Sequence, residues 1–184
     1  DHDYVFAHTE YDFATNNVGF EVFRFEDDQA VEHWDNIQLR QGPNRSGHSM
    51  VDGPTEADDL DKTDENRGLV CSYVQEVLIP MHADRLQEHV DVAAYVEHNP
   101  QGEDGHNALL NSFTPSPENK RYMQLHRALA EGNFVLTVCE GIANNMHSAL
   151  YDLYRVEAGK IVEHWDTIET IPDPSLWKNS NGKF

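Results

Sequence analysis

The amino-acid sequence predicts an α+β fold in which helices pack on one face of a curved antiparallel sheet. The first observation is that apolar residues recur at helical spacing between residues 63 and 80. The second is that β-branched and aromatic residues fill the segments after residue 120, which is typical of strands. Helices that precede an antiparallel meander indicate a domain in which the helices cover one face of the sheet.

Three helices are expected. Thr63 is placed to N-cap the first helix, because the two acids that follow it favour the positive end of the helix dipole. Pro80 ends this helix, since proline lacks the backbone N–H that the next turn requires. A second, short helix is predicted near 84–90 and a third at 104–113.

Four strands are expected after the helices. The alternation of apolar and polar residues predicts them in RYMQLHRALA (121–130), NFVLTVCE (133–140), SALYDLYRVE (148–157) and KIVEHWDTIET (160–170). The tripeptide AGK (158–160) is a hairpin turn between the last two strands.

The chain also contains an internal repeat. The string VEHWD occupies 31–35 and recurs at 162–166, and the surrounding stretches, 20–38 and 151–169, share eight identities in nineteen positions. Weaker matches extend both ways: DYVFAHTE (3–10) aligns with NFVLTVCE (133–140), and NRSG (44–47) with NSNG (179–182).

The simplest interpretation of the repeat is a two-repeat ancestor whose first repeat has lost its N-terminal, helical half. Residues 1–50 are then a partial repeat that supplies only strands, and residues 62–184 are the complete domain. Residues 51–61 belong to an acidic stretch of low hydrophobicity, which predicts a solvated linker between the two units.

Composition excludes several classes of function. The net charge of −20, from 33 acids against 13 bases, argues against nucleic acid as a partner, because binding phosphates requires clustered lysine and arginine. It argues equally against anionic membrane surfaces. The sequence holds no apolar run of the length that crosses a bilayer, and no zinc, phosphate-loop, dinucleotide or serine-hydrolase motif.

The two cysteines, Cys71 and Cys139, fall in apolar segments and are expected to be buried free thiols. Such thiols fit a reducing compartment, so a cytoplasmic location is expected. The chain starts without Met and without a secretory signal, which suggests a processed boundary or a piece of a longer protein.

Several stretches resemble a known family. YVEHNPQGEDG, LAEGNFVLTVCEG, YDLYRVEAGKIVEHWD and the terminal NSNGKF are similar to the SnoaL-like, polyketide cyclase-like branch of the nuclear-transport-factor-2-like (NTF2-like) superfamily. The resemblance covers 62–184, and residues 1–60 match the second half of the same unit. It implies three helices packed on a strongly bent sheet that encloses a conical pocket.

The resemblance also implies a function, although fold alone does not determine it. The leading hypothesis is a small enzyme without cofactor or metal that performs acid–base chemistry on a hydrophobic carbonyl compound, of the SnoaL-like aldol, cyclase or isomerase type. The alternative is a non-catalytic module that binds a small hydrophobic ligand or mediates assembly.

Three residues are the candidate catalytic groups. Asp166 is proposed as the base that removes a proton next to a carbonyl, since burial of a carboxylate in an apolar pocket raises its basicity. His98, just before Pro100, is either a polar cap of a turn or an acid–base group at the pocket wall. His126 is either a hydrogen-bonded core histidine or a catalytic one.

Strand alternation separates the residues of the last strand into two faces. One face carries His164 and Asp166, and the other carries Glu163 and Trp165; neither is cleanly apolar, so the sequence does not decide which one lines the pocket. The expected substrate-binding residues are Asp152, Tyr154, His164 and Trp165, with Asp152 as the rival carboxylate. A metal site is not expected, because the spacing matches no compact metal motif.

The first copy of VEHWD cannot perform the same chemistry, because a half-unit without helices encloses no pocket. Its strands are therefore expected to pack on the sheet formed by 118–171, with Trp34 in the contact. The face that this leaves uncovered is predicted to be buried by a second chain, in a homodimer formed through the sheet.

Overall fold

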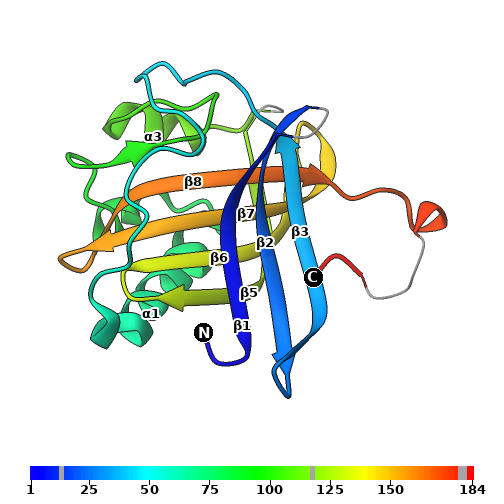
Figure 1. Cartoon of the computed structure of the whole chain (residues 1–184). Helices are drawn as coiled ribbons and strands as arrows, with labels where there is room; N and C mark the ends of the chain where they lie inside the picture. The colour runs from blue at the N-terminus through cyan, green and yellow to red at the C-terminus, as the bar shows by residue number, and fades with distance from the viewer. Residues whose placement is uncertain (13–14, 117–118, 178–181) are drawn as a thin grey trace.

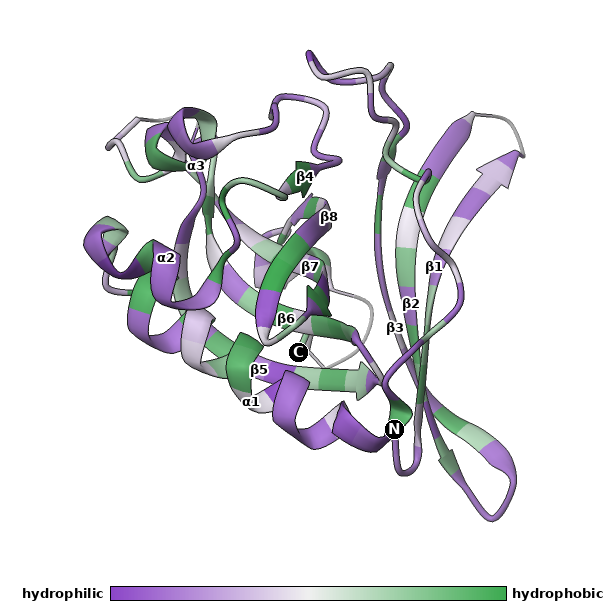
Figure 2. Ribbon diagram, turned by 90° about the vertical axis from the view of Figure 1, so that its left-hand side faces the viewer, coloured by the Kyte–Doolittle hydropathy of each residue, from purple (hydrophilic) through white to green (hydrophobic). Residues whose placement is uncertain are grey.

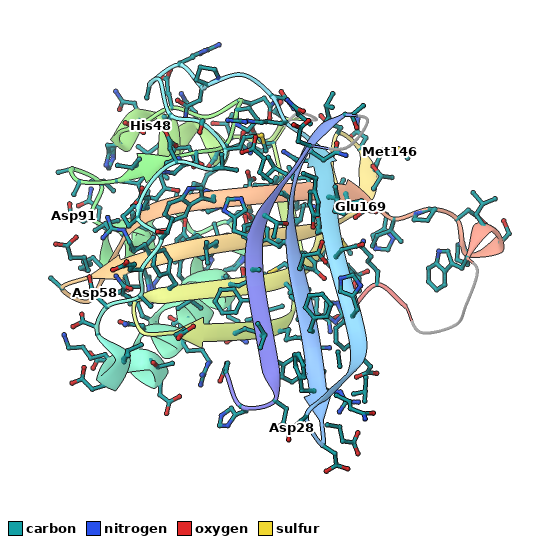
Figure 3. The ribbon with its side chains drawn as sticks, in the orientation of Figure 1. Asp28, His48, Asp58, Asp91, Met146 and Glu169 are labelled. Carbon is teal, nitrogen blue, oxygen red and sulfur yellow. The ribbon has the colours of Figure 1, made fainter. Side chains whose placement is uncertain are left out.

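The computed structural model describes residues 1–12, 15–116, 119–177 and 182–184, which form a three-stranded and a five-stranded sheet. The N-terminal sheet is an antiparallel meander in the order β1-β2-β3. Its strands are β1 (Tyr4–Asp12), β2 (Asn16–Glu26) and β3 (Gln29–Leu39). Asp28, at the turn between β2 and β3, projects away from the rest of the molecule (Figure 3).

The second sheet has the order β4-β8-β7-β6-β5. Its strands are β4 (Val96–Glu97), β5 (Arg121–Glu131), β6 (Phe134–Ala143), β7 (Met146–Glu157) and β8 (Lys160–Thr170). The four long strands follow the predicted antiparallel meander. The short edge strand β4 pairs parallel to β8, so the sheet is mixed rather than purely antiparallel. Bulges in β5 and β8 shift the register and bend the sheet.

The helices cover one face of the five-stranded sheet, as predicted (Figure 2). They are α1 (Thr63–Tyr73), which continues as a π-helical turn (Val74–Leu78), α2 (Leu86–His89) and α3 (His106–Ser112). Thr63 is not the N-cap of α1; Lys62 holds that position, and the Thr63 hydroxyl donates to the Leu60 carbonyl and accepts from Gly132 N–H. This hydroxyl ties α1 to the turn between β5 and β6.

The space between the helices and the five-stranded sheet is filled by one apolar cluster. Leu86 of α2 and Ile161 of β8 are almost fully buried there, as are Val70, Val74 and Val77 of α1 and the turn that follows it. The helical spacing read from the sequence thus corresponds to the buried face of α1. None of the helices in the described residues is long and apolar enough to span a membrane.

The three-stranded sheet lies across the opposite face of the five-stranded sheet (Figures 1 and 2). Phe20 and Val22 of β2 are buried against residues of β6, β7 and β8, including Tyr151 and Trp165. Trp34 contacts this cluster, and the Arg127 guanidinium lies 4.4 Å from the centre of its ring. The prediction that the N-terminal strands pack on the main sheet with Trp34 in the contact is confirmed.

The two copies of the repeated sequence adopt the same local structure. Glu21 faces Asp35 across β2 and β3, and Asp152 faces Asp166 across β7 and β8. Arg24 forms an ion pair with Glu32, and the equivalent Arg155 donates to Glu163 at 2.6 Å. The origin of the first copy in a lost half-repeat stays a prediction.

The two hairpins also contact each other in a reciprocal way. Ile168 N–H donates to the Gln38 side-chain oxygen at 2.9 Å, and Ile37 N–H donates to the Glu169 carboxylate at 3.4 Å. Ile37 and Ile168 are equivalent in the repeat, as are Gln38 and Glu169. The contact between the two sheets is therefore close to two-fold symmetric within one chain.

The expected homodimer places a second chain on the face of the N-terminal strands that the main sheet leaves uncovered. β1–β3 cover the outer face of the five-stranded sheet, as that prediction assumes. Val5 and Val31 of the three-stranded sheet are exposed. The contact with a second chain stays a prediction.

The acidic segment 51–61 keeps most of its side chains in solvent, but its backbone is anchored on the main sheet. Trp165 Nε1–H donates to the Asp52 carbonyl at 2.8 Å, and Asn133 N–H donates to the Asp58 carbonyl at 2.8 Å. Gly53 has a φ of +109°, and a Cβ there would lie 2.7 Å from the Trp165 ring. The segment is therefore a fixed strap, and Asp58, near its C-terminal end, is labelled in Figure 3.

Candidate functional site

A cavity of about 690 Å³ opens between the helices and the inner face of the five-stranded sheet. Four tyrosines line it: Tyr73 of α1, Tyr95 just before β4, Tyr122 of β5 and Tyr154 of β7. Apolar surface comes from Leu78, Leu109, Phe113 and Ile168. The N-terminal part of the chain also contributes to the lining, through Gln38 and Leu39 of β3 and through Gln41 and Arg45 after it. The size and the mixture of apolar and polar groups suit a small organic molecule.

The alternation of side chains along β8 decides which residues of the repeated string VEHWD lie on the cavity side of the sheet. His164 and Tyr154 line the cavity, and Asp166 of β8 and Asp152 of the neighbouring β7 lie on the same side of the sheet, buried behind the cavity wall. Glu163 and Trp165 lie on the opposite side, beneath the three-stranded sheet and the strap. The structure thus brings together four of the predicted site residues: Asp152, Tyr154, His164 and Asp166.

Lys120 is the centre of the polar network of this site. Its ammonium lies 2.8 Å from Asp152 Oδ1 and 2.7 Å from Asp166 Oδ2. The Asn99 side-chain amide donates to both oxygens of Asp166, at 2.8 and 2.7 Å. Asp152 and Asp166 are almost completely buried, whereas Lys120 is 19% exposed and lines the cavity. Of the three charged groups, the ammonium is therefore the most accessible to a ligand in the cavity.

His164 links the second half of the network. Its Nδ1–H donates to Glu97 at 2.9 Å, and its Nε2–H donates to Asp152 Oδ1 at 2.9 Å. Tyr122 donates its hydroxyl proton to the same Asp152 oxygen at 2.8 Å. Asp152 Oδ2 has no hydrogen-bond partner among the described residues, although it is buried. An unpaired buried oxygen is costly and is more common at functional sites than in an ordinary core.

The charges of the network follow from these contacts. Burial disfavours the charged imidazolium, but Glu97 and Asp152 outweigh it and raise the pKa of His164 to about 10. Burial likewise opposes the charge of Lys120, yet Asp152 and Asp166 hold its pKa well above the usual value. Burial opposes ionisation of Asp152 as well, but Lys120 and His164 keep its pKa well below the ordinary range. At neutral pH Asp152 is therefore a carboxylate held by two cations.

Two cavity hydroxyls complete the chemistry of the site. Tyr73 and Tyr154 line the cavity, and neither hydroxyl has a hydrogen-bond partner among the described residues. Burial, followed by the Asp152 charge, raises the pKa of Tyr154 well above its usual value, so this residue stays a neutral donor. Its ring stacks on His164 at 5.0 Å. Tyr154 is thus placed to donate to an oxygen atom of a ligand.

The charge of His164 leads to a prediction on stability and pH. The folded-state pKa of about 10 lies above the unfolded value of 6.5, so the stabilisation is complete below pH 6.5 and is lost as the pH rises toward 10. We expect the free energy of unfolding to fall from pH 7 to pH 9.5, and to fall less steeply in His164→Gln, which cannot titrate. Urea unfolding at several pH values measures this, with His126→Gln as the control. Equal slopes in all three proteins would contradict the assignment of charge to His164.

His98 does not reach the cavity, so its prediction as a pocket-wall acid or base is wrong. Glu97 and Asn99 point toward Asp152 and Asp166, and His98, between them in an extended segment, points to the other side. Its ring stacks on Trp165 at 4.5 Å and contacts Glu163 at 2.9 Å. Although burial opposes its charge, the hydrogen bond to Glu163 raises the pKa of His98. His98 fastens the strap to the sheet, and Trp165 packs there instead of binding substrate.

His126 also lies away from the cavity, so its prediction as a catalytic residue is wrong. Its ring lies on the outer side of β5, where it contacts Glu140 at 3.0 Å and stacks on Phe184 at 4.1 Å. Register shifts in β5 on both sides of Leu125 reverse the simple alternation that placed it inside. His126 is therefore a surface residue, and it does not belong to the cavity.

The cavity trio Asp152, His164 and Asp166 offers ligand atoms that all lie within 4.8 Å of one another, a spacing that suits a metal ion. The Lys120 ammonium, however, already lies between the two carboxylates. A metal ion would have to displace this cation, so the donor set as folded fits a metal poorly.

Four residues of the network were not predicted from the sequence: Glu97, Asn99, Lys120 and Tyr122. Glu97 and Asn99 carry a usable signal, because they alternate with His98 in a segment that precedes a proline and is therefore extended. Lys120 and Tyr122 alternate in the same manner at the start of β5. No sequence feature shows that these two segments meet over β8.

No known family profile matches this chain, and no curated protein matches it significantly by sequence. Solved structures do match. A protein named as a ketosteroid isomerase from Kribbella flavida is 15% identical, covers 66% of this chain and 94% of its own, and superposes with a TM-score of 0.53.

Two further structures match in the same way. An NTF2-like protein of unknown function from Cytophaga hutchinsonii is 19% identical, covers 64% and 95% of the two chains, and has a TM-score of 0.48. A SnoaL-like polyketide cyclase from Jannaschia is 12% identical, covers 64% and 92%, and also has a TM-score of 0.48. Because ketosteroid isomerases belong to the NTF2-like superfamily, the match to the first structure shows that this chain has the NTF2-like fold.

Proposed function

We propose that this protein is a small enzyme that performs acid–base chemistry on a hydrophobic carbonyl compound, of the SnoaL-like aldol, cyclase or isomerase type. The observation that supports this most strongly is the Lys120 ammonium at the cavity wall, held by Asp152 and Asp166 at 2.8 and 2.7 Å. A fixed cation beside a carboxylate can serve removal of a proton next to a carbonyl, because the cation stabilises the negative charge that develops on the carbonyl oxygen.

The proposed step assigns one role to each group. The carbonyl oxygen of the substrate accepts hydrogen bonds from Lys120 and from the free hydroxyl of Tyr154. Asp166 removes the adjacent proton, and the electron pair of the broken C–H bond moves to the carbonyl oxygen as an enolate. Lys120 stabilises that negative charge, and the proton returns from Asp166 to the product carbon.

Asp166 suits the role of base better than Asp152. Asp152 Oδ1 already accepts from Lys120, His164 and Tyr122, and its pKa is well below the usual range. Asp166 contacts one cation, Lys120, whereas Asp152 is held by two, Lys120 and His164. His164 holds Glu97 and Asp152 in place and remains an imidazolium, so it acts as a positioning residue.

A second candidate function is non-catalytic binding of a small hydrophobic ligand. It is supported by the surroundings of Asp166, which is almost completely buried and whose two carboxylate oxygens both accept hydrogen bonds from the Asn99 amide. The substrate would have to displace that amide to reach the base. The cavity serves ligand binding equally well in this case.

Deuterium exchange separates the two functions. A bicyclic hydrophobic ketone is incubated with the protein in D₂O, and incorporation of deuterium next to the carbonyl is followed by NMR. We expect exchange well above the buffer rate, together with saturation as the ketone concentration rises. Saturable binding of the ketone without any enhanced exchange would favour the binding module and contradict the proposed enzyme.

A further inference from the structure

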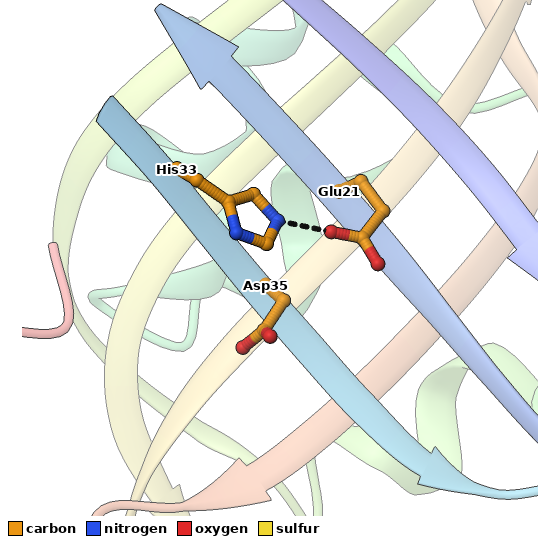
Figure 4. A group of neighbouring side chains, drawn as sticks. All are labelled: Glu21, His33 and Asp35. Atoms are coloured by element: carbon orange, nitrogen blue, oxygen red, sulfur yellow. Dashed lines mark hydrogen bonds and ion pairs between the residues drawn. The ribbon is translucent and has the colours of Figure 1, made fainter. Parts of the chain in front are cut away.

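A second group of acid and imidazole side chains lies on the outer face of the three-stranded sheet. Glu21, His33 and Asp35 come from the neighbouring strands β2 and β3, and Glu21 and Asp35 are directly paired (Figure 4). One ligand atom from each lies within 4.8 Å of the other two. In the repeat these residues are the counterparts of Asp152, His164 and Asp166.

The outer group is open to solvent, in contrast to its counterpart in the cavity. The side chains of His33 and Asp35 are each 44% exposed, and that of Glu21 is 14% exposed. His33 is nevertheless held in place, because its ring stacks on Phe23 at 4.4 Å and its Nε2 contacts the Glu21 carboxylate. Two of the three groups therefore need little reorganisation to bind an ion from solution.

The difference between the two groups lies in the cation. In the cavity, the Lys120 ammonium bridges both carboxylates of the trio. On the outer face, no lysine or arginine among the described residues bridges Glu21 and Asp35. Lys183 approaches Asp35 Oδ1 only to 3.6 Å, because its ammonium contacts the Asp35 carbonyl and Glu169 at 2.7 Å. The two carboxylates that a lysine bridges in one copy thus have counterparts without a bridging cation in the other.

We propose that Glu21, His33 and Asp35 bind a divalent transition-metal ion of the zinc type. One imidazole nitrogen and two carboxylate oxygens are ligands that zinc accepts, and water completes the fourth position. The imidazole favours such metals over magnesium and calcium, which prefer oxygen ligands throughout. The metal takes the place of the direct contact between His33 Nε2 and the Glu21 carboxylate, and the two side chains move slightly apart to coordinate it.

The site would have a structural consequence. Glu21 lies on β2 and His33 and Asp35 on β3, so one ion ties together two strands whose outer face no other described element covers. A metal that binds only the folded hairpin stabilises it, and the stabilisation grows with the logarithm of the metal concentration above the dissociation constant. The site is independent of the cavity, which lies on the far side of the five-stranded sheet.

Calorimetric titration of the full chain with zinc chloride tests this inference. We expect one equivalent to bind to the wild type, and the affinity to fall at least about tenfold in His33→Gln and in Asp35→Asn. His147→Gln is the matched control, because His147 also pairs with a surface carboxylate, that of Glu140, and its loss should leave zinc binding unchanged.

Thermal unfolding checks that the variants are folded, so that a loss of zinc binding is not a consequence of misfolding. Without zinc the three variants should unfold within a few degrees of the wild type, and zinc should raise the unfolding temperature of the wild type and His147→Gln only. Absence of a saturable one-equivalent site in the wild type would overturn the proposal. Unchanged zinc affinity in folded His33→Gln would overturn it as well.

Discussion

Replacing Lys120 by Met is expected to lower the free energy of unfolding by about 3–5 kcal/mol at neutral pH. The ammonium is the shared partner of Asp152 and Asp166, which are 0% and 1% exposed. Methionine fills a similar volume but leaves Asp166 with only the Asn99 amide to compensate its buried charge. Breaking a buried ion pair from one side costs more than the pair contributes, because the remaining charge stays desolvated.

The pH dependence of this loss identifies its cause. Protonation of a carboxyl group removes the uncompensated charge, so the difference between Lys120→Met and the wild type should shrink as the pH falls from 7 to 5. Urea unfolding at both pH values measures it. Arg121→Met is the control, since this neighbouring side chain is exposed and should change stability little. A loss below 1 kcal/mol, or one that does not depend on pH, would show that the network does not need the lysine.

Replacing Trp165 by Ala is expected to cost about 3–5 kcal/mol. The ring is 2% exposed, stacks on His98 at 4.5 Å, and lies 6.1 Å from the Phe134 ring, centre to centre. Its N–H also holds the strap at Asp52. The substitution therefore leaves a cavity at the contact between the sheets and removes one anchor of the strap.

The repeat supplies the matched control for this prediction. Trp34 has the same neighbours in sequence but is only partly buried, so Trp34→Ala should cost about 1–2 kcal/mol, roughly in proportion to the smaller apolar area that it buries. Guanidinium unfolding of the two variants gives both values. Equal losses would mean that burial does not distinguish the two copies, contrary to the structure.

The fold could be predicted because its signals are local. The helical spacing of α1 and the alternation of β5 to β8 reflect which side chains are buried, and the two-residue turns need only short-range sequence features. The repeat added a long-range prediction, the packing of β1–β3 on the main sheet. The parallel pairing of β4 with β8 could not be predicted, because a two-residue strand has no periodicity.

The site was predicted only in part, and strand alternation explains why. Asp152 and Asp166 share a face because they pair across β7 and β8, and His164 follows by alternation. The prediction of His98 rests on the chemistry of imidazole, but in an extended segment its neighbours Glu97 and Asn99 point to the side that reaches the network. His126 was misplaced because bulges change the alternation of β5, and a bulge has no clear signature in this sequence. The place of Lys120 in the site depends on tertiary contacts alone, and no local sequence pattern predicts them.

If chemistry occurs at the Lys120–Asp166 pair on the cavity side of β8, the ketone-exchange rate in D₂O should distinguish Asp166→Asn from His126→Gln. Both changes remove an ionisable group that the sequence marks as a candidate. Only Asp166 contacts Lys120, which lines the cavity, whereas His126 lies on the outer side of β5. Thermal unfolding of the two variants confirms that both remain folded.

We expect Asp166→Asn to lower the exchange rate by about 10²–10⁴-fold, the usual contribution of a general base, while ketone binding persists. The exchange rate of His126→Gln should stay within about twofold of the wild-type rate, since removing a surface group away from the reacting atoms is usually near-neutral. Undiminished exchange in folded Asp166→Asn would contradict the claim, and a large loss in His126→Gln would place the chemistry on the outer side of β5.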